Sequence, residues 1–427
     1  MKNRLACVFG CSVILLAVGC AFPRLGPATP PPVSTPLPQL TPTIPPPVTE
    51  TPNPENASPH LSPGTLLTLS RIYMVSTNNG WAIGTAETEK NAHILHTTDG
   101  GLTWKDVTPP EPLDTSGTKD AIAYFADDSN LWVSYSILQT SLSNPATQAV
   151  IWASHDGGKT WTASQPLDAS QGFESYQPGL LHFSDATHGW FMAHVGVGMS
   201  HDYVFFYSTR DAGNTWTRLA DPYNESSFPQ VCCKYDMVFT DATHGWLAGN
   251  THGVMPGIFF YQTADAGQTW SLVNLPAPAA YPNLFTTQDF ACGTYEIQFV
   301  DARRGFVGVE CFSQVNTPNL GWLYVTADGE GTWAPEDVPQ AQGLFQFLNP
   351  GQGWYVADKV YQTTDGGRHW TPGATVTWTG VPDFVDSLNG WLVASKENAL
   401  ALVRSNDAGA SWTLLKPVVA PSFFCEF

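Results

Sequence analysis

Positive charge is scarce in this 427-residue chain. It has 18 Lys and Arg against 37 Asp and Glu, for a formal net charge of −19. A chain this acidic is a poor partner for nucleic acid or anionic lipid, because both are bound mainly through Lys and Arg. We therefore expect no nucleic-acid partner and attribute the acidity to solubility.

Helical periodicity is also missing. No stretch shows a sustained 3.6-residue apolar spacing. Segments such as KYDMVF (234–239), GIFFYQT (257–263) and LYVTA (323–327) are instead rich in aromatic and β-branched residues. This composition is typical of strands and predicts an all-β fold.

One eight-residue stretch occurs twice almost unchanged, as FSDATHGW (183–190) and FTDATHGW (239–246). The general pattern is an apolar residue, a small polar turn residue two positions later, and a Gly-Trp pair four positions after that. We call it the first turn motif, in which Asp, Asn or Ser opens the turn and Gly closes it. It begins seven times, at Met74, Phe125, Phe183, Phe239, Phe299, Phe347 and Phe384, with Leu131 replacing Gly in the second copy and Phe306 replacing Trp in the fifth.

A second turn motif follows each copy of the first. Its copies are TTDGGLTW (97–104), SHDGGKTW (154–161), TRDAGNTW (209–216), TADAGQTW (263–270), TADGEGTW (326–333), TTDGGRHW (363–370) and SNDAGASW (405–412). Its Asp can accept backbone N–H groups of its own loop, Gly supplies a positive φ, and Trp packs the following strand. We therefore expect structural roles for Asp99, Asp156, Asp211, Asp265, Asp328, Asp365 and Asp407.

The two motifs alternate strictly, which defines seven units of about 52 residues in 64–427. Units of this length suit four short strands, and seven of them predict a seven-bladed β-propeller. A β-solenoid is the alternative, but its repeats are shorter and need no second kind of turn.

The second motif resembles the Asp-box, or BNR repeat (S/T-x-D-x-G-x-T-W), of sialidases, sortilins and xyloglucanases. Paired with F-x-D-x-x-x-G-W, it is most similar to the photosystem II assembly and stability factor-like repeat proteins. The resemblance covers almost all of residues 66–416, with departures at Glu330 and His369. It implies an extracytoplasmic seven-bladed propeller whose Asp-boxes lie away from any active site. The resemblance also implies an Arg-rich surface patch that binds the membrane-protein client of those assembly factors. The Arg residues here are instead scattered along the sequence, which argues against the same client.

The N-terminus predicts export and tethering. Residues 1–19 have Lys2 and Arg4, an apolar stretch and small residues before Cys20, as in a secretory signal peptide. Ala17-Val18-Gly19-Cys20 resembles a bacterial lipobox, which implies cleavage and lipidation of Cys20. The alternative is an uncleaved anchor, because the apolar stretch is close to spanning length. Either places the propeller on the extracellular face or in the periplasm, attached to a membrane.

Residues 20–63 predict a linker between the tether and the propeller at 64–427. The stretch from Phe22 to Pro63 contains 15 of the chain's 35 prolines. A segment of this kind cannot bury a core and remains extended.

Cysteine positions predict one disulfide. Cys292 and Cys311 flank the hairpin that turns at 301–305, so they should face each other on adjacent strands. Cys425 could pair with Cys232 or Cys233, which would leave one thiol free.

The irregular connections predict where a ligand binds. Both turn motifs lie on one face of a propeller, which we call the scaffold face. The longer connections lie on the opposite face, which we call the loop face. Aromatic residues in these connections are candidates for ligand contact: Phe173, Tyr176, Tyr223, Phe228, Tyr281 and Phe285.

Catalysis is the alternative function. A sialidase-like site would need three converging Arg, and SRIYMV (70–75) lacks the Pro of the sialidase Arg-Ile-Pro signature. A xyloglucanase-like glycoside hydrolase needs only two nearby carboxylates. The available carboxylates are Asp120, Asp127, Asp128, Glu174, Asp289, Glu296 and Asp383.

Histidines of the third unit raise the question of a metal. His182, His194 and His201 lie near Asp202 in the sequence, but we expect surface histidines rather than a metal site. The sequence thus favours a monomeric, non-catalytic binding or assembly module without cofactor or metal. Its loop face would bind a protein complex or a cell-surface glycan.

Overall fold

The structure is a computed structural model. It describes residues 60–87, 91–110, 120–138, 150–167, 175–198, 201–222, 228–231, 233–251, 257–315 and 317–421. The chain divides into Met1–Val48 and Thr49–Phe427, and every described residue belongs to the second unit. The predicted signal peptide, Cys20 and nearly all of the linker therefore lie outside the described residues. Among those described there is no helix, and hence none that could cross a membrane.

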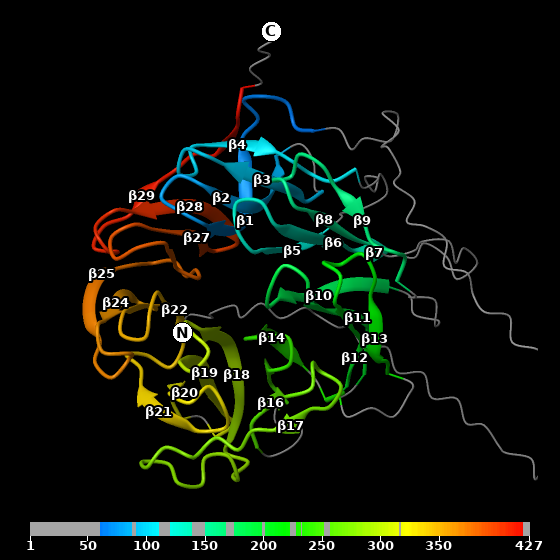
Figure 1. Ribbon diagram of the computed structural model, residues 1–427. Coiled ribbons are helices and arrows are strands. Elements are labelled where there is room, and N and C mark those ends of the chain that lie inside the picture. Colours follow the sequence, from blue (N-terminus) through cyan, green and yellow to red (C-terminus); the bar gives the residue numbers. More distant parts are fainter. Residues whose placement is uncertain are drawn as a thin grey trace, which may run out of the picture. The chain divides into compact units, whose positions relative to one another are not determined.

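Seven antiparallel sheets follow one another around a ring (Figure 1). Blades 1 to 3 consist of β1 (Leu67–Met74), β2 (Gly80–Ala86), β3 (His93–Thr97) and β4 (Thr103–Asp106); β5 (Ala121–Phe125), β6 (Leu131–Tyr135), β8 (Ile151–Ser154) and β9 (Thr162–Ala163); and β10 (Ser175–Phe183), β11 (Gly189–Val197), β12 (Asp202–Thr209) and β13 (Thr217–Ala220). Blades 4 and 5 consist of β14 (Lys234–Phe239), β15 (Gly245–Gly249), β16 (Phe260–Thr263) and β17 (Ser271–Leu272); and β18 (Phe290–Phe299), β19 (Gly305–Ser313), β20 (Leu320–Thr326) and β21 (Trp333–Asp337). Blades 6 and 7 consist of β22 (Leu344–Phe347), β23 (Gly353–Val356), β24 (Lys359–Thr363) and β25 (Thr371–Thr375); and β26 (Asp383–Phe384), β27 (Gly390–Lys396), β28 (Ala399–Ser405) and β29 (Thr413–Leu414).

This arrangement confirms the predicted all-β, seven-bladed propeller of four-stranded blades. The first turn motif joins the first and second strands of each blade, and the second turn motif joins the third and fourth. Two short strands are additional: β7 (Ile137–Leu138) pairs with the start of β10, and β30 (Val418–Val419) pairs in parallel with β4.

The second turn motif is held by its own carboxylate. In blade 1, Asp99 Oδ1 accepts the backbone N–H of Thr103 (2.9 Å) and Asp99 Oδ2 accepts its hydroxyl (2.7 Å). The two sequence departures change single bonds. His369 donates to Asp365 through Nδ1 (2.6 Å) where a Thr hydroxyl usually does, and at Asp328 the N–H of Glu330 is a donor (2.9 Å).

The first turn motif joins neighbouring blades, because its Trp stacks on the Phe of the next blade. The ring centroids of Trp190 and Phe239 are 3.5 Å apart, with an interplanar angle of 1°. Glycine is needed beside this stack, since a Cβ at Gly245 would lie 2.6 Å from the Phe239 ring. In blade 2, where Leu131 replaces that Gly, the stack between Trp81 and Phe125 widens to 5.6 Å.

Blades 7 and 1 close the ring (Figure 1). The indole N–H of Trp391 donates to the Gly100 carbonyl (2.9 Å). The residues before β1 pair with the C-terminal strand: the N–H of Gly64 donates to the Val419 carbonyl, and the N–H of Val419 to the Thr65 carbonyl, each at 2.9 Å. Residues from both ends of the repeat array are therefore bonded to each other.

Candidate functional site

Polar side chains in the turns of the scaffold face form hydrogen bonds within those turns. Each described turn of the first motif is bridged by its opening side chain; Asp241, for example, accepts the N–H groups of Thr243 (2.7 Å) and His244 (2.8 Å) through Oδ1. The His244 ring nitrogen Nδ1 also lies 2.8 Å from Asp241 Oδ2. These repeated groups stabilise turns, as the sequence predicts, and His188 pairs with Asp185 in the same way.

The first strands of blades 3, 5, 6 and 7 each bond to the next blade near the axis. The side chain just before the Phe that begins the first turn motif bonds to the backbone of the Phe or Met at the equivalent position of the next blade. Gln298 donates to the Phe347 carbonyl (2.7 Å) and accepts its N–H (2.6 Å). At the closing seam, Asp383 accepts the N–H of Met74 (2.5 Å).

Two residues earlier on these strands, charged side chains of different blades lie near enough to influence one another. Arg71 lies in blade 1 and Asp236 in blade 4, which are not neighbouring blades, yet the charge of Arg71 acts on the pKa of Asp236. That interaction has to cross the axis. Burial raises the pKa of Asp236 above its usual range, against the opposing effects of backbone N–H groups and Arg71.

Glu296 in blade 5 is the next side chain in this group. Burial, joined by the charge of Asp236, raises the pKa of its carboxyl to about 8, although it accepts the N–H of Phe345 (3.1 Å). The register of β18 against β19 shifts between Tyr295 and Ile297, so Glu296 is the extra residue of a β-bulge. Its φ of 47° is in the left-handed region, which non-glycine residues rarely adopt. Bulges of this kind redirect a side chain and are common beside functional sites.

Burial similarly raises the pKa of Asp383 to about 7. Asp236, Glu296 and Asp383 nevertheless each keep part of their surface accessible. Protein therefore surrounds these carboxyls without sealing them off. Of the carboxylates available in the sequence, the structure brings Glu296 and Asp383 to the axis and adds Asp236, which pattern reasoning missed.

The loop-face ends of blades 4 and 5 add aromatic residues. Tyr235 is the extra residue of a bulge in β14 and is 46% exposed. Its pKa is raised by burial of the hydroxyl and by the charges of Asp202 and Glu310. Glu310 Oε1 is buried without a hydrogen-bond partner, and burial raises the pKa of this carboxyl as well. Two residues further along β19, on the same side of the strand, Phe312 is 38% exposed.

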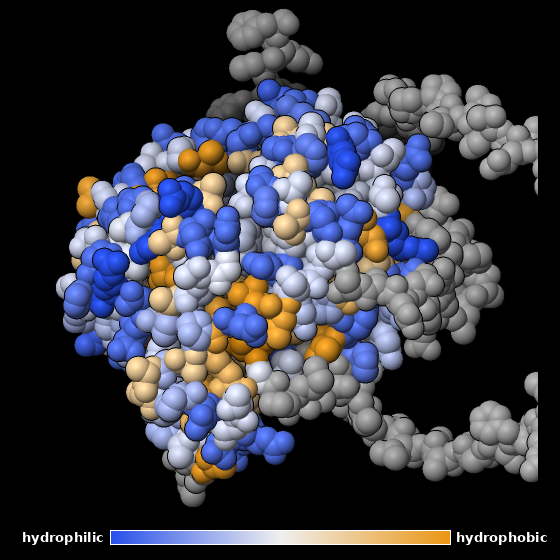
Figure 2. Space-filling view, turned by 60° about the horizontal axis from the view of Figure 1, so that its bottom comes forward, coloured by the Kyte–Doolittle hydropathy of each residue, from blue (hydrophilic) through white to orange (hydrophobic). Residues whose placement is uncertain are grey.

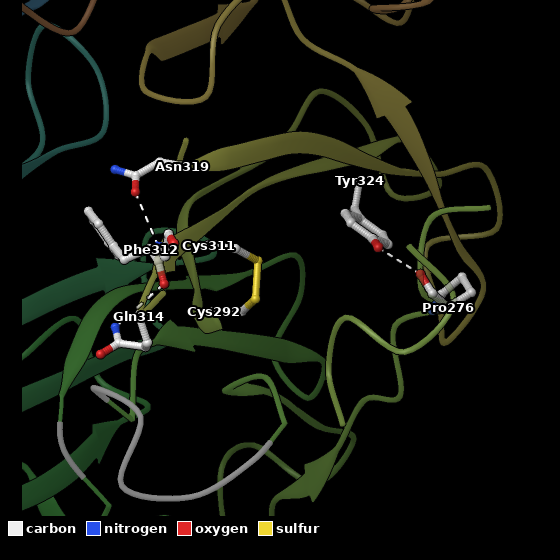
Figure 3. The surroundings of a disulfide bond; sticks show 8 residues. Pro276, Cys292, Cys311, Phe312, Gln314, Asn319 and Tyr324 are labelled. Atoms are coloured by element: carbon white, nitrogen blue, oxygen red, sulfur yellow. Dashed lines mark hydrogen bonds between the residues drawn. A yellow bond between two sulfur atoms is a disulfide. The ribbon is translucent and has the colours of Figure 1, made fainter. Parts of the chain in front are cut away.

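A disulfide stiffens this end of blade 5. Cys292 and Cys311 are directly paired across β18 and β19 and are bonded, with the Cα atoms 4.0 Å apart, as the sequence predicts (Figure 3). The ring of Phe312 points away from the disulfide, and the N–H of the next residue, Ser313, bonds to Asn319 (3.2 Å). The first strand of blade 5 has ten residues and that of blade 4 has six, so blade 5 extends further toward the loop face. Figure 2 shows hydrophobic residues gathered in patches on an otherwise largely hydrophilic side of the molecule.

Three polar residues join blades 3 and 4 near the loop face. His194 Nδ1 lies 2.7 Å from Asp202 Oδ1, and Lys234 Nζ lies 3.6 Å from Asp202 Oδ2. Lys234 also donates to the Val231 carbonyl (3.1 Å), and burial lowers its pKa to about 8. His182 is elsewhere, bonded to the Phe239 carbonyl (2.9 Å). The part of the chain that the structure describes has no group of three or more metal-binding side chains.

The predicted aromatic contacts have different outcomes. Phe228 is buried against Phe206, with ring centroids 4.7 Å apart, so it is a core residue and the prediction that it contacts a ligand is wrong. Phe285 is half-buried against the core between blades 4 and 5. Tyr281 is 40% exposed and packs edge-on against Trp322. Tyr176 lies in β10, where its side chain is outside the description, and Phe173 and Tyr223 lie outside the described residues.

Cys233 is disulfide-bonded, and its partner lies outside the described residues, as do Cys232 and Cys425. Two Arg residues that are far apart in the sequence lie close together in space. Arg304 of blade 5 is close enough to Arg368 of blade 6 that its pKa is lowered, mainly by burial and then by that charge. Both lie on the scaffold face near carboxylates, with Arg368 Nε 3.8 Å from Glu336.

Comparison with known proteins supports the fold. No protein-family model matches the sequence, and no curated protein matches it. A solved structure of YCF48 bound to a D1 peptide aligns with 81% of this chain and 94% of its own, at a TM-score of 0.50 and 17% identity. A polysaccharide lyase, the PL25 ulvan lyase with bound -[GlcA(1-4)Rha3S]-, aligns with 86% of this chain and 98% of its own at a TM-score of 0.45 and 11% identity. A puromycin-hydrolysing peptidase from Mycobacterium tuberculosis aligns with 85% of this chain and 57% of its own, at 0.49 and 11%. At such identities the likeness to YCF48 shows the propeller fold, and the other two carry no argument.

Proposed function

We propose that this protein is a membrane-tethered, extracytoplasmic binding module that holds a protein complex or a cell-surface glycan on its loop face. The main support for this proposal is the contrast between the two faces. The repeated polar groups of the scaffold face already form hydrogen bonds within their own turns. The loop-face ends of blades 4 and 5 instead bring the half-buried residues Glu296 and Glu310 near the exposed ring of Tyr235.

The tether in this proposal comes from the sequence. The signal peptide and lipidation at Cys20 would fix the chain to the outer side of a membrane through a Pro-rich linker. YCF48 was solved with a D1 peptide, so a propeller of this fold can take a protein segment.

Photo-cross-linking in the native membrane tests the binding face. A benzophenone amino acid replaces Tyr281 or Phe312 on the loop face, one position at a time. Leu102 and Leu388, which are 51% and 53% exposed in scaffold-face turns, are matched controls. We expect recurrent cross-links to one partner from the loop-face positions and none from the controls. Cross-links from the controls alone would overturn the proposal.

A glycoside hydrolase is the second candidate, favoured by the adjacent axial carboxyls Asp236 and Glu296 with raised pKa values. Against it, both carboxyls, like Asp383, are already acceptors for a backbone N–H of the next blade. They thus have a structural role that explains their presence. The test is an assay for reducing sugar released from a polysaccharide. Release by the native protein that is lost in Glu296→Gln would establish hydrolase activity.

A further inference from the structure

We propose that the hairpin tip of blade 5 binds a segment of a partner protein in which apolar side chains lie between Lys or Arg residues. The hairpin tip comprises residues 312–315 and 317–319, where β19 ends and connects to β20. This inference rests on the proposed function and selects the protein partner over the glycan.

Two apolar side chains of the hairpin tip are exposed. Phe312 is 38% exposed and Val315 is 53% exposed, whereas Cys311, just before the tip, is buried. The ring of Phe312 points away from the disulfide (Figure 3). Exposed aromatic and aliphatic side chains so close together on one hairpin can be buried against a partner, and their burial would stabilise the complex.

Hydrogen bonds hold the hairpin tip in one conformation above the disulfide between β18 and β19. The Ser313 hydroxyl accepts the N–H of Thr317 (2.9 Å), and the N–H of Ser313 donates to Asn319 Oδ1 (3.2 Å). The N–H of Gln314 donates to the Asp289 carbonyl (2.7 Å), which ties the tip to the residues before β18. A surface that is ordered before it binds loses less conformational entropy on binding.

The charges at the loop-face end of blade 5 are negative. Asp289 and Asp337 are exposed there, and Glu310 lies in β19 just before the tip. Between 273 and 347 the only Lys or Arg residues are two arginines in the scaffold-face turn at 301–305. None of the ion pairs of the described residues involves these three carboxyls. Lys or Arg on a partner would complement these charges, and an acidic segment would be repelled.

The chemistry of the hairpin tip favours a polypeptide over a glycan. Val315 is aliphatic and offers no flat surface for a sugar ring. The polar side chains of Ser313 and Asn319 already bond to the backbone of the tip itself and do not converge on a ligand. An aromatic and an aliphatic side chain together instead match the apolar side chains of another protein.

Fluorine NMR of the full-length protein in detergent micelles tests the inference at the tip itself. Trifluoromethylphenylalanine replaces Phe312 as the reporter and, in a separate control protein, replaces Leu388 on the scaffold face. The probes are acetyl-Arg-Phe-Arg-Phe-Arg-amide, its counterpart with Glu in place of Arg, and its counterpart with Ser in place of Phe. We expect the arginine–phenylalanine peptide to shift the resonance at position 312 saturably, with a Kd below about 1 mM, and to leave that at position 388 unchanged. The other two peptides should bind at least about tenfold more weakly.

A substitution at Val315 tests whether the exposed side chains act together. Val315→Ser, made with the reporter at position 312, should weaken binding of the arginine–phenylalanine peptide about fivefold. Leu388→Ser changes an equally exposed position, at 53%, and should leave the affinity unchanged. Because Val315 is exposed, its substitution should also leave the thermal midpoint unchanged, which separates lost binding from unfolding.

Several outcomes would overturn the inference: no saturable shift at position 312, an equal affinity for the glutamate or the serine peptide, or an affinity unaffected by Val315→Ser. A shift caused by cellohexaose and by none of the peptides would assign the tip to a glycan, and a shift that follows protein concentration alone would assign it to a second copy of this chain; either would overturn it too. Cross-links from Tyr281 in the native membrane without a response at position 312 would refute this inference and leave the proposed function standing. Absence of both would refute the two together.

Discussion

At the residue scale, a left-handed backbone conformation occurs at repeated turn positions and at one position inside a strand. In the second turn motif, Ala212, Ala266 and Ala408 have φ values near 60°, where other blades have Gly. Each of their carbonyls accepts the indole N–H of the preceding blade's Trp. Glu296 has a similar φ inside a strand, at the bulge of β18, where its side chain bonds to the next blade.

Ala212→Gly should therefore stabilise the protein by about 0.5–1 kcal/mol, because relief of the left-handed strain outweighs the added freedom of the unfolded chain. Ala410→Gly, in the last second-turn motif at a position without positive φ, is the control and should be neutral or destabilising. Urea unfolding measures both. A loss of stability in Ala212→Gly would show that the left-handed conformation of Ala212 is not strained.

The axial carboxyls predict a dependence of stability on pH. Burial raises the pKa of Asp383 to about 7 in the folded state, above its ordinary value of 3.8. The folded state then binds more protons between these values, so the free energy of unfolding falls as pH rises from about 4 through 7. Asp383→Asn removes this contribution while it keeps an acceptor for Met74.

The free energy of unfolding of Asp383→Asn should thus rise relative to the parent between pH 5 and pH 8. Asp365→Asn is the control, because His369 and backbone bonds lower the pKa of Asp365 to about 2. Its difference from the parent should change only below about pH 4. A constant difference for Asp383→Asn across this range would contradict the raised pKa.

At the element scale, the blade 5 hairpin depends on a covalent link. The bond between Cys292 and Cys311 spans 19 residues and holds the long strands β18 and β19 together at their loop-face end. The double change Cys292→Ser with Cys311→Ser should lower the free energy of unfolding by roughly 3 kcal/mol. Denaturation of both proteins without reductant measures this, and equal stabilities would show that strand pairing alone holds the hairpin.

Elements were the part of the fold that the sequence predicted best. The two motifs mark turns, and turns at fixed spacing determine strand number and blade number. The sequence could not show why the first turn motif repeats Phe and Trp, because these residues contact each other between blades. The ring of Trp190, for example, stacks on Phe239 of the next blade. Phe228 was misassigned for a similar reason: a loop aromatic and a core aromatic look alike in a sequence, and only the neighbouring Phe206 distinguishes them.

At the scale of the whole molecule, ring closure creates the candidate site. Arg71 and Glu296 are far apart in the sequence and become neighbours of Asp236 only when seven first strands surround one axis. Single-sequence reasoning could place Glu296 and Asp383 among available carboxylates but could not say which of them converge. The same closure leaves repeated residues on the scaffold face and unrepeated ones on the loop face.

The central claim is that the loop face, and not the scaffold face, binds. Amide hydrogen exchange of the tethered protein, with and without the partner captured by photo-cross-linking, tests it most directly. We predict slowed exchange in 233–236 and 290–296 with no change in the second turn motifs, such as 97–104 and 363–370. Protection of those turns with no change at the loop-face ends of blades 4 and 5 would contradict the account.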